Sequence, residues 1–269
     1  MGLAICCALF APWLAPHDPV KADLTIRLIP PFFQKGGSLN NPLGTDHIGR
    51  DILSRIIYGA RISLAVGSVS TVVGFIIGGI LGLLSGYHGG MTDSLITKLM
   101  DIQLSFPFIL FAIFVIGVLG PNLINIIIIC GVTRWVMFAR VIRGEVLSIR
   151  EKEFIEAARG IGCSASRILI RHVFPNIIPS VLVLATLNIG TIIVLESTLS
   201  FLGLGVQPPT PSWGSMLNDG KVYMVQAWWI TALPGIAIMF VVLSSNIIGD
   251  YLSDLVNPHA KQLMEIVEQ

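Results

Sequence analysis

The stretch of sequence that decides the fold is residues 62–86, which read ISLAVGSVSTVVGFIIGGILGLLSG. None of these residues is Asp, Glu, Lys or Arg, and the charge-free run from Ile62 extends over 31 residues to Thr92. An α-helix needs roughly 20 apolar residues to cross the hydrocarbon core of a bilayer, which is about 30 Å thick. We therefore expect residues 62–86 to cross a membrane as a helix.

The composition of the whole chain agrees with this expectation. Of the 269 residues, 54% are hydrophobic and 12% are charged, whereas soluble proteins carry about 25% charged residues. Disorder is excluded, because a disordered chain needs low hydrophobicity and high charge. A net charge of +1 without a basic run argues against binding to nucleic acid. An all-α polytopic membrane protein is the class that remains.

Three further stretches lack charged residues, and they lie at 102–133, 173–195 and 222–249. The first of them contains Gly120-Pro121-Asn122, a turn signature that divides it into two helices. The sequence thus predicts five full spans, near residues 62–86, 99–119, 122–143, 176–198 and 226–250.

Residues 1–15 are also free of charge, but fifteen helical residues reach only about 22 Å. A secretory signal does not fit, because a basic leader region is missing. We expect a partial first transmembrane helix whose beginning precedes this numbering. A half-length interfacial helix is the alternative.

Cysteine and histidine spacing indicates no metal site and no disulfide framework. The four cysteines lack ligand-like spacing, and the five histidines are scattered singly. No nucleophile–base set emerges along the chain. We expect no catalytic residue, no metal and no cofactor bound by this chain itself.

The largest polar segment, residues 16–61, contains a predicted amphipathic helix. Thr45 or Asp46 can cap it by accepting backbone N–H bonds. Apolar and polar residues behind this cap separate onto two faces, with Ile48, Ile52, Leu53, Ile56 and Ile57 on one and Arg50, Asp51, Ser54 and Arg55 on much of the other. That period predicts a helix lying in the headgroup region, with a solvated loop helix as the alternative.

The distribution of Lys and Arg orients the spans. Segment 140–172 carries seven of these residues, whereas the longer segment 16–61 carries six. The positive-inside rule therefore places 140–172 in the cytoplasm and 16–61 outside it. The chain divides on this topology into a partial helix at 1–15, an extracytoplasmic loop at 16–61, a transmembrane domain at 62–259 and a cytoplasmic tail at 260–269.

Residues 151–172 are predicted to form a compact helix–turn–helix on the cytoplasmic side. Glu156 can pair with Arg159 at a spacing of three residues. Ala157 and Ala158 are small enough to let another surface approach closely. This element has little apolar surface of its own, so we expect a partner protein to grip it.

Glycine and proline residues delimit the parts of this element. Gly160 and Gly162 interrupt the first helix, as a C-cap or sharp turn requires. Ser164 can cap the second helix. Pro175 suits the first turn of the membrane helix that follows, where a missing N–H costs little.

Glu156-Ala157-Ala158, followed by Gly162 and by His172-Val173-Phe174-Pro175, resembles the EAA loop of ABC-importer permeases. The usual ending of that motif is a hydrophobic residue, any residue, Leu and Pro, from which His172 and Phe174 depart. Four further segments resemble the dipeptide/oligopeptide/nickel subfamily of these permeases: Leu43–Asp46 with Gly49–Asp51, Gly59–Leu64, Ser105-Phe106-Pro107 and Leu199–Gly214. The resemblance covers about residues 10 to 259.

The resemblance implies a six-span permease fold in the bacterial inner membrane. Its implied partners are a second permease, two cytoplasmic ATPase subunits that bind ATP and Mg, and an extracytoplasmic solute-binding protein. It also implies an ATPase-coupling role for Glu156, Ala157, Ala158, Arg159, Gly162 and Pro175. The phosphate-binding pattern Gly-x4-Gly-Lys-Ser/Thr does not occur in this chain, since Val222 follows its only Gly-Lys pair.

Two further sites are expected toward the outer ends of the spans. Glu196 interrupts an apolar run, and with Ser197 and Ser200 it could line the translocation path; an interfacial carboxylate paired with a loop residue is the alternative. The stiff loop that carries Pro208, Pro209 and Trp213 is expected to dock the solute-binding protein.

The resemblance favours short peptides as the solute, with glutathione and nickel chelates as alternatives for the same machinery. An ion-coupled secondary transporter fits less well, because such proteins commonly place carboxylates in mid-span and these spans hold almost none. A membrane enzyme or scaffold is the third class.

Overall fold

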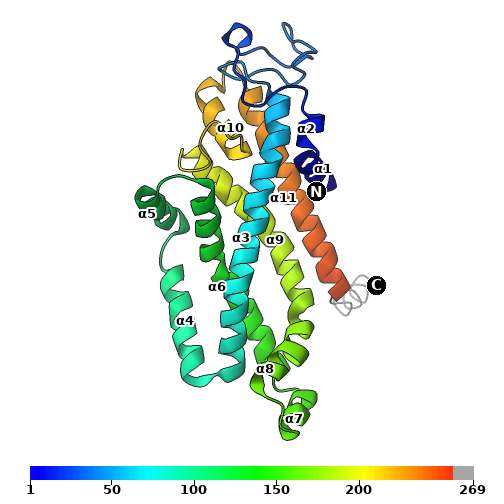
Figure 1. The fold of residues 1–269 in the computed structure, drawn as a ribbon, viewed down its shortest axis with the longest axis vertical. Helices are drawn as coiled ribbons and strands as arrows, with labels where there is room; N and C mark the ends of the chain where they lie inside the picture. The colour runs from blue at the N-terminus through cyan, green and yellow to red at the C-terminus, as the bar shows by residue number, and fades with distance from the viewer. Residues whose placement is uncertain (257–269) are drawn as a thin grey trace, which may run out of the picture. The chain divides into compact units, whose positions relative to one another are not determined.

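The computed structural model describes residues 1–256, and its described part is built from helices without a β-sheet (Figure 1). The longer helices are α1 (Gly2–Leu9), α3 (Ile52–His88), α4 (Gly90–Leu104), α5 (Phe108–Leu119), α6 (Leu123–Ile149), α7 (Glu153–Gly160), α9 (Phe174–Phe201), α10 (Trp213–Gly220) and α11 (Trp229–Val256). Two short helices are α2 (Ala11–Leu14) and α8 (Ala165–Ile168). The tail expected at residues 260–269 lies outside the described residues.

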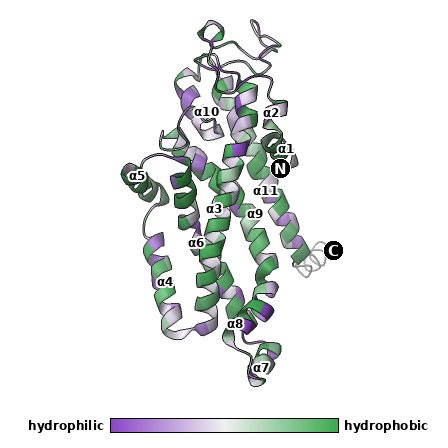
Figure 2. Ribbon diagram, in the orientation of Figure 1, coloured by the Kyte–Doolittle hydropathy of each residue, from purple (hydrophilic) through white to green (hydrophobic). Residues whose placement is uncertain are grey.

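Four helical stretches in the described chain are long and apolar enough to cross a membrane: Ile52–His88, Leu123–Ile149, Ala165–Phe201 and Trp229–Val256. The pair α4 and α5 makes a fifth if the break between them lies within one span. Figure 2 shows hydrophobic residues along these helices. The prediction of an all-α membrane protein is confirmed, with the break inside the expected span 99–119 as a correction.

The break falls at Ser105-Phe106-Pro107, between α4 and α5. Proline disfavours helical backbone at the residue before it and supplies no N–H of its own. The apolar run therefore cannot continue as one helix, although its composition alone would permit a span.

The N-terminal segment forms α1 and α2, which are shorter than a span. Its apolar side chains are largely exposed, among them Leu3, Leu9 and Trp13. The expectation of a partial first membrane helix at residues 1–15 stays a prediction.

The chain folds into two compact units, each assembled from segments that are distant in sequence. The first unit comprises Met1–Val69, Ile109–Ile129 and Ile189–Ser245. The second comprises, among the described residues, Ser70–Phe108, Cys130–Asn188 and 246–256. Each unit buries a hydrophobic core of its own.

Trp213 at the start of α10 lies at the centre of the first unit. It is 2% exposed, and its indole N–H donates to the carbonyl of Ile56 over 3.0 Å. A Cβ on Gly59 would lie 3.0 Å from this ring, so glycine lets α3 approach it closely. The core around the ring comprises Ile52, Ala60, Leu64, Ile193, Met216, Ala227, Trp229, Ile230 and Val241.

The amphipathic helix expected near the end of segment 16–61 is wrong as a separate element. Residues 52–61 are instead the first turns of the 37-residue helix α3. Its cap is Asp51 rather than Thr45 or Asp46, because the Oδ2 of Asp51 accepts the backbone N–H of Ser54 at 2.8 Å.

A ladder of glycines on α3 brings this helix close to α6 in the second unit. A Cβ on Gly78 would lie 2.3 Å from the carbonyl oxygen of Trp135, and one on Gly82 would lie 2.7 Å from that of Ala139. Gly86 continues the four-residue spacing, and small residues at this spacing let membrane helices pack with their backbones close together. The ladder explains why the first apolar run is rich in glycine.

Charged and polar contacts tie α4 to α6 within the second unit. Arg143 donates to both carboxylate oxygens of Asp93, at 2.6 and 2.7 Å. Asp101 pairs with Arg140 at 3.0 Å. The Arg143–Asp93 pair is bidentate and therefore geometrically specific, so it sets the register of α4 on α6.

Candidate functional sites

The first candidate site is α7 with the turn that ends it, in the second unit. Gly162 has φ +81°, which suits glycine. Its N–H donates to the carbonyl of Arg159 at 2.9 Å, and the N–H of Cys163 donates to that of Ala158 at 3.0 Å. These two bonds form a Schellman motif, which satisfies the last carbonyls of the helix. The turn predicted at Gly160 and Gly162 is therefore present, with Gly162 as its left-handed residue.

One face of α7 is anchored to the core of the second unit. Ile155 and Ala158 are buried in a cluster with Ile168 of α8 and side chains of α6 and α9. The guanidinium of Arg159 lies 5.3 Å from the centre of the Tyr87 ring, a cation–π contact. The anchored face makes α7 a rigid extension of the helices behind it.

The opposite face of α7 is open. Phe154, Glu156 and Ala157 are exposed, and Ile161 beside them is 82% exposed. The expected Glu156–Arg159 pair is not formed, because Arg159 lies on Tyr87 and Glu156 has no ion pair within residues 1–256. Ala157 is thus exposed, whereas Ala158 is buried in the core of the second unit.

Pro175 is the second residue of α9 and lies in the first turn of that helix, as expected. The residues before it, Leu169–Val173, form one π-helical turn between α8 and α9. Pro175 has no N–H to donate to a carbonyl of the preceding turn. A π turn inside an α-helix accommodates such a missing bond.

Glu196 of α9 lies in the first unit and is 0% exposed. Its Oε1 accepts hydrogen bonds from the hydroxyls of Ser200 at 2.6 Å and Ser212 at 3.1 Å. The hydroxyls of Ser197 and Ser63 complete the set of donors around the carboxylate. Serines from α3, α9 and the start of α10 therefore meet at one carboxylate.

This enclosure bears on the two alternatives for Glu196. Ser197 and Ser200 are nearly as buried as Glu196, at 5% and 2% exposed. Glu196 and Ser200 line no cavity described here, whereas Ser197 lines a cavity of about 300 Å³ with Thr198 and Phe201. The bond to Ser212 matches the alternative of a carboxylate paired with a loop residue. We therefore assign Glu196 and Ser200 to fixing α10 rather than to contact with a solute.

The loop between α9 and α10 is held closely against α9. Gly203, with φ +82°, ends α9 in a second Schellman motif. A Cβ on Gly214 would lie 2.6 Å from the Cα of Ser197, so only glycine fits there. Pro208 and Pro209 are exposed, as expected of docking residues. The expectation for Trp213 is wrong, because its side chain fills the core of the first unit.

A buried ion-pair cluster lies in the first unit and was not expected from the sequence. Arg50 donates to Asp46 at 2.6 Å and to Asp219 of α10 at 2.8 Å. Arg55 donates to the same two carboxylates. The cluster holds the loop before α3 against α10. Asp219 of α10 lies more than 160 residues from Arg50 and Arg55 in sequence.

The pKa of Asp46 reflects this setting. Burial alone would raise it, but the guanidinium groups of Arg55 and Arg50 and the backbone N–H groups of Arg50 and Ile48 hold it below its ordinary value. His47 places a ring nitrogen within 4.8 Å of carboxylate oxygens of Asp46 and Asp219. Both carboxylates already bind arginine, so this group is an ion-pair network and not a set of vacant metal ligands.

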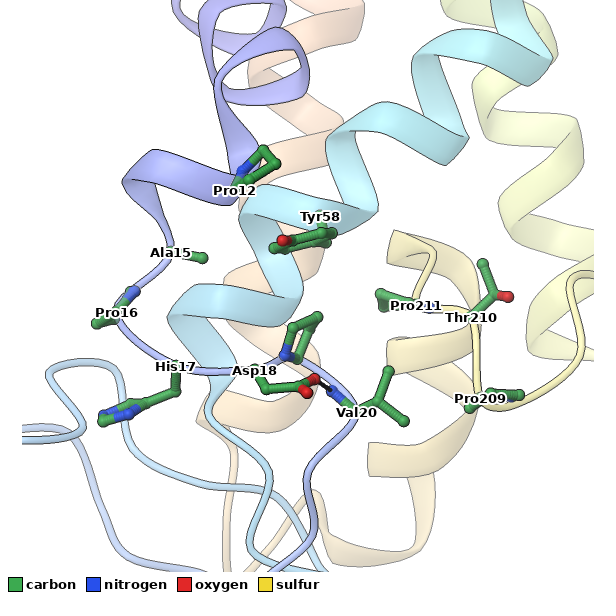
Figure 3. Close-up of a pocket in the computed structure, with 11 residues that line it drawn as sticks. Pro12, Ala15, Pro16, His17, Asp18, Val20, Tyr58, Pro209, Thr210 and Pro211 are labelled. Carbon is green, nitrogen blue, oxygen red and sulfur yellow. Dashed lines mark hydrogen bonds between the residues drawn. The ribbon is translucent and has the colours of Figure 1, made fainter.

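A cavity of about 600 Å³ lies in the first unit beside residues 202–212, the loop between α9 and α10, which we call the proline loop. Figure 3 shows the walls of this cavity. Tyr58 projects into it from α3, Pro12 lines it from α2, and two loop segments form the rest. We call it the proline pocket, and it is lined by Pro12, Ala15, Pro16, His17, Asp18, Pro19, Val20, Tyr58, Pro209, Thr210 and Pro211. The exposed Pro209 is thus part of a concave surface.

Comparison with protein families finds a match at residues 78–262 to the family described as the inner membrane component of binding-protein-dependent transport systems. The di/tripeptide transport system permease protein DppC of Pseudomonas aeruginosa is 42% identical, over 97% of this chain and 86% of its own length. The glutathione transport system permease protein GsiD of Escherichia coli O6:K15:H31 is 44% identical, over 96% of this chain and 84% of its own length.

Solved structures with a similar fold come from ABC transporters. A chain of the inward-facing methionine transporter MetNI superposes with a TM-score of 0.62 at 21% identity, covering 75% of this chain and 96% of its own. A chain of an amino acid ABC transporter gives 0.54 at 13% identity, covering 78% and 94%. Both show a shared fold.

Proposed function

Because this chain belongs to the family of inner membrane components of binding-protein-dependent transport systems, we propose that it forms, with a second permease, the path by which short peptides enter the cell. The observation that supports this solute is the set of relatives that match nearly the whole chain. Their names give di/tripeptides, D,D-dipeptides and glutathione as solutes, all of which are short peptides.

The coupling of transport to ATP is proposed to run through α7. The exposed face with Glu156 and Ala157 would dock on a cytoplasmic ATPase subunit, while Ile155 and Ala158 hold the other face in the core of the second unit. That core includes side chains of α6 and α9, so a pull on α7 displaces these helices as a body. ATP and Mg would bind to the ATPase subunits, because this chain has no phosphate-binding pattern.

The proposed role of α7 also orients the chain in the membrane. With α7 in the cytoplasm, alternation of the spans places the loop before α3 and the proline loop outside, as the positive-inside rule predicts for segments 140–172 and 16–61. Pro208 and Pro209 would then be available to the solute-binding protein. The ion-pair cluster and Glu196 hold this outer surface in one shape.

Reconstituted transport tests the proposed function. The assembled transporter is placed in proteoliposomes with its solute-binding protein and ATP, and uptake of labelled dipeptides, glutathione and a nickel chelate is compared. We expect peptide uptake that stops without ATP. Uptake that persists without ATP but collapses with an uncoupler would instead indicate an ion-coupled transporter.

A further inference from the structure

The proline pocket has the size and rigidity of a small-molecule site. Its volume of about 600 Å³ lies within the usual range for ligand pockets, roughly 300–1,000 Å³. Five of its eleven lining residues are prolines, whose rings fix the backbone. A wall that is already ordered loses little entropy when a ligand binds.

The polar groups of the pocket favour a cationic ligand. Asp18 is the only residue of the lining set that carries a formal charge at neutral pH. Its Oδ1 accepts the backbone N–H of Val20 at 2.8 Å, which leaves Oδ2 without a partner in the described structure. Figure 3 shows the carboxylate on the wall below Tyr58. A small cation with hydrogen-bonding capacity is therefore the complementary ligand.

Two hydroxyls complete the set of available groups. The side-chain hydroxyls of Tyr58 and Thr210 have no hydrogen-bond partner among residues 1–256. Hydroxyls donate to and accept from peptide groups equally well. No Lys or Arg lines the pocket, so a carboxylate would find hydrogen-bond donors there but no partner with a full positive charge.

We propose that the proline pocket binds the N-terminal end of a short peptide, with its α-ammonium group on Asp18 and its first peptide group near the Tyr58 and Thr210 hydroxyls. The C-terminal carboxylate points away from the pocket, so binding is tolerant of peptide length. This inference rests on the proposed function, because it takes the solute to be a peptide. It adds a receiving site on the permease itself.

Direct binding tests the pocket apart from transport. The assembled transporter in lipid nanodiscs, without the solute-binding protein, is dialysed against labelled Ala-Ala, N-acetyl-Ala-Ala and Ala-Ala-amide. We expect N-acetylation to weaken binding about 2- to 5-fold, the range for an exposed ion pair. Amidation of the C-terminus should leave binding unweakened.

Substitutions test whether the effect of N-acetylation on binding arises at Asp18. In Asp18→Asn the preference for the free N-terminus should vanish, while the retained side-chain oxygen still accepts the Val20 N–H. Asp23→Asn is the matched control, since Asp23 is an exposed carboxylate that accepts the N–H of Thr25 in the same type of turn, outside the pocket. Val20→Trp, which fills the pocket, should weaken binding of all three peptides.

Three outcomes would overturn the proposed peptide site while leaving the proposed function in place. One is an N-acetylation effect of the same size in Asp18→Asn as in the wild type. Another is no peptide binding by a transporter that imports peptides once the binding protein is added. A loss of binding-protein capture in Asp18→Asn, with peptide binding unchanged, would identify the pocket as a protein contact and also reject the proposal. Absence of import for every peptide would refute the proposed function instead.

Discussion

The hydroxyl of Ser212 donates to the carboxylate of Glu196 across 3.1 Å and at the same time accepts the backbone N–H of Ser215. The Ser212 side chain thus caps α10 and ties it to α9. Glu196 is 0% exposed, so this bond is shielded from solvent. The orientation of α10 therefore depends on a carboxylate that the sequence alone presented as an isolated charge in an apolar run.

Replacement of Glu196 by alanine should destabilise the first unit. The substitution leaves the hydroxyls of Ser200 and Ser212 buried without their acceptor, which costs about 1–3 kcal/mol for each unsatisfied group. Glu196→Gln keeps an acceptor oxygen and should cost less. Thermal unfolding in nanodiscs measures both, and equal stability of Glu196→Ala and the wild type would contradict the assignment.

The Asp46 carboxylate should make the free energy of unfolding depend on pH in the acidic range. Its pKa is lower in the folded protein than in the unfolded chain, so its contribution is complete above the unfolded value of about 4 and is lost as pH falls through the folded value. Asp46→Asn should lower stability at pH 7 by about 3–5 kcal/mol, because two buried guanidinium groups lose a partner. The variant should also show a shallower loss of stability below pH 4. Unfolding measured from pH 3 to pH 7 checks both effects, and parallel curves for variant and wild type would be the contrary result.

The glycine ladder should tolerate no added methyl group at Gly82. A Cβ there would lie 2.7 Å from the Ala139 carbonyl oxygen and 3.0 Å from the Ile142 Cβ. Gly82→Ala should therefore cost about 1–3 kcal/mol through displacement of α6 from α3. Gly79→Ala is the matched control, because its nearest neighbour would lie at 3.5 Å, and alanine favours the helix by up to about 1 kcal/mol. If unfolding shows the same change for both variants, the close approach of α3 and α6 is not the cause.

Gly162 should be required for the shape of the turn after α7. Gly162→Ala meets no atom within 4 Å, but it places a side chain at φ +81°, which costs about 1–2 kcal/mol. Gly160 is the last residue of α7, and a Cβ there would also meet no atom within 4 Å. Gly160→Ala should therefore leave the shape of the turn unchanged. ATP-dependent peptide uptake and ATPase co-purification should fall only in Gly162→Ala. Equal uptake by the two variants would count against a role of this turn in coupling.

The spans could be predicted because each is a local property of the sequence. A charge-free run of sufficient length has few alternatives to a membrane helix, and α3, α6, α9 and α11 follow such runs. The turn at Gly162 could also be predicted from local sequence, since a glycine after a short helix is a common C-cap.

The wrong prediction for residues 48–57 came from contacts between distant segments, whereas the break at Ser105-Phe106-Pro107 has a local cause. Arg50 and Arg55 gave a polar face to residues 48–57, and this pattern suggested a helix at the membrane surface. Both side chains are buried because Asp219 lies against them, and no local pattern indicates that partner. The short segment Asp46 to Arg50, rich in polar residues next to a long apolar helix, was the available signal.

We propose above that α7 is the contact by which an ATPase subunit moves this permease. The most direct test is a cryo-EM map of the assembled transporter with nucleotide bound. The account predicts that the exposed side chains of Phe154, Glu156 and Ala157 are buried in a groove of a nucleotide-binding subunit, with Ile155 still in the permease core. A map in which these three residues face solvent and contact no ATPase subunit would contradict it.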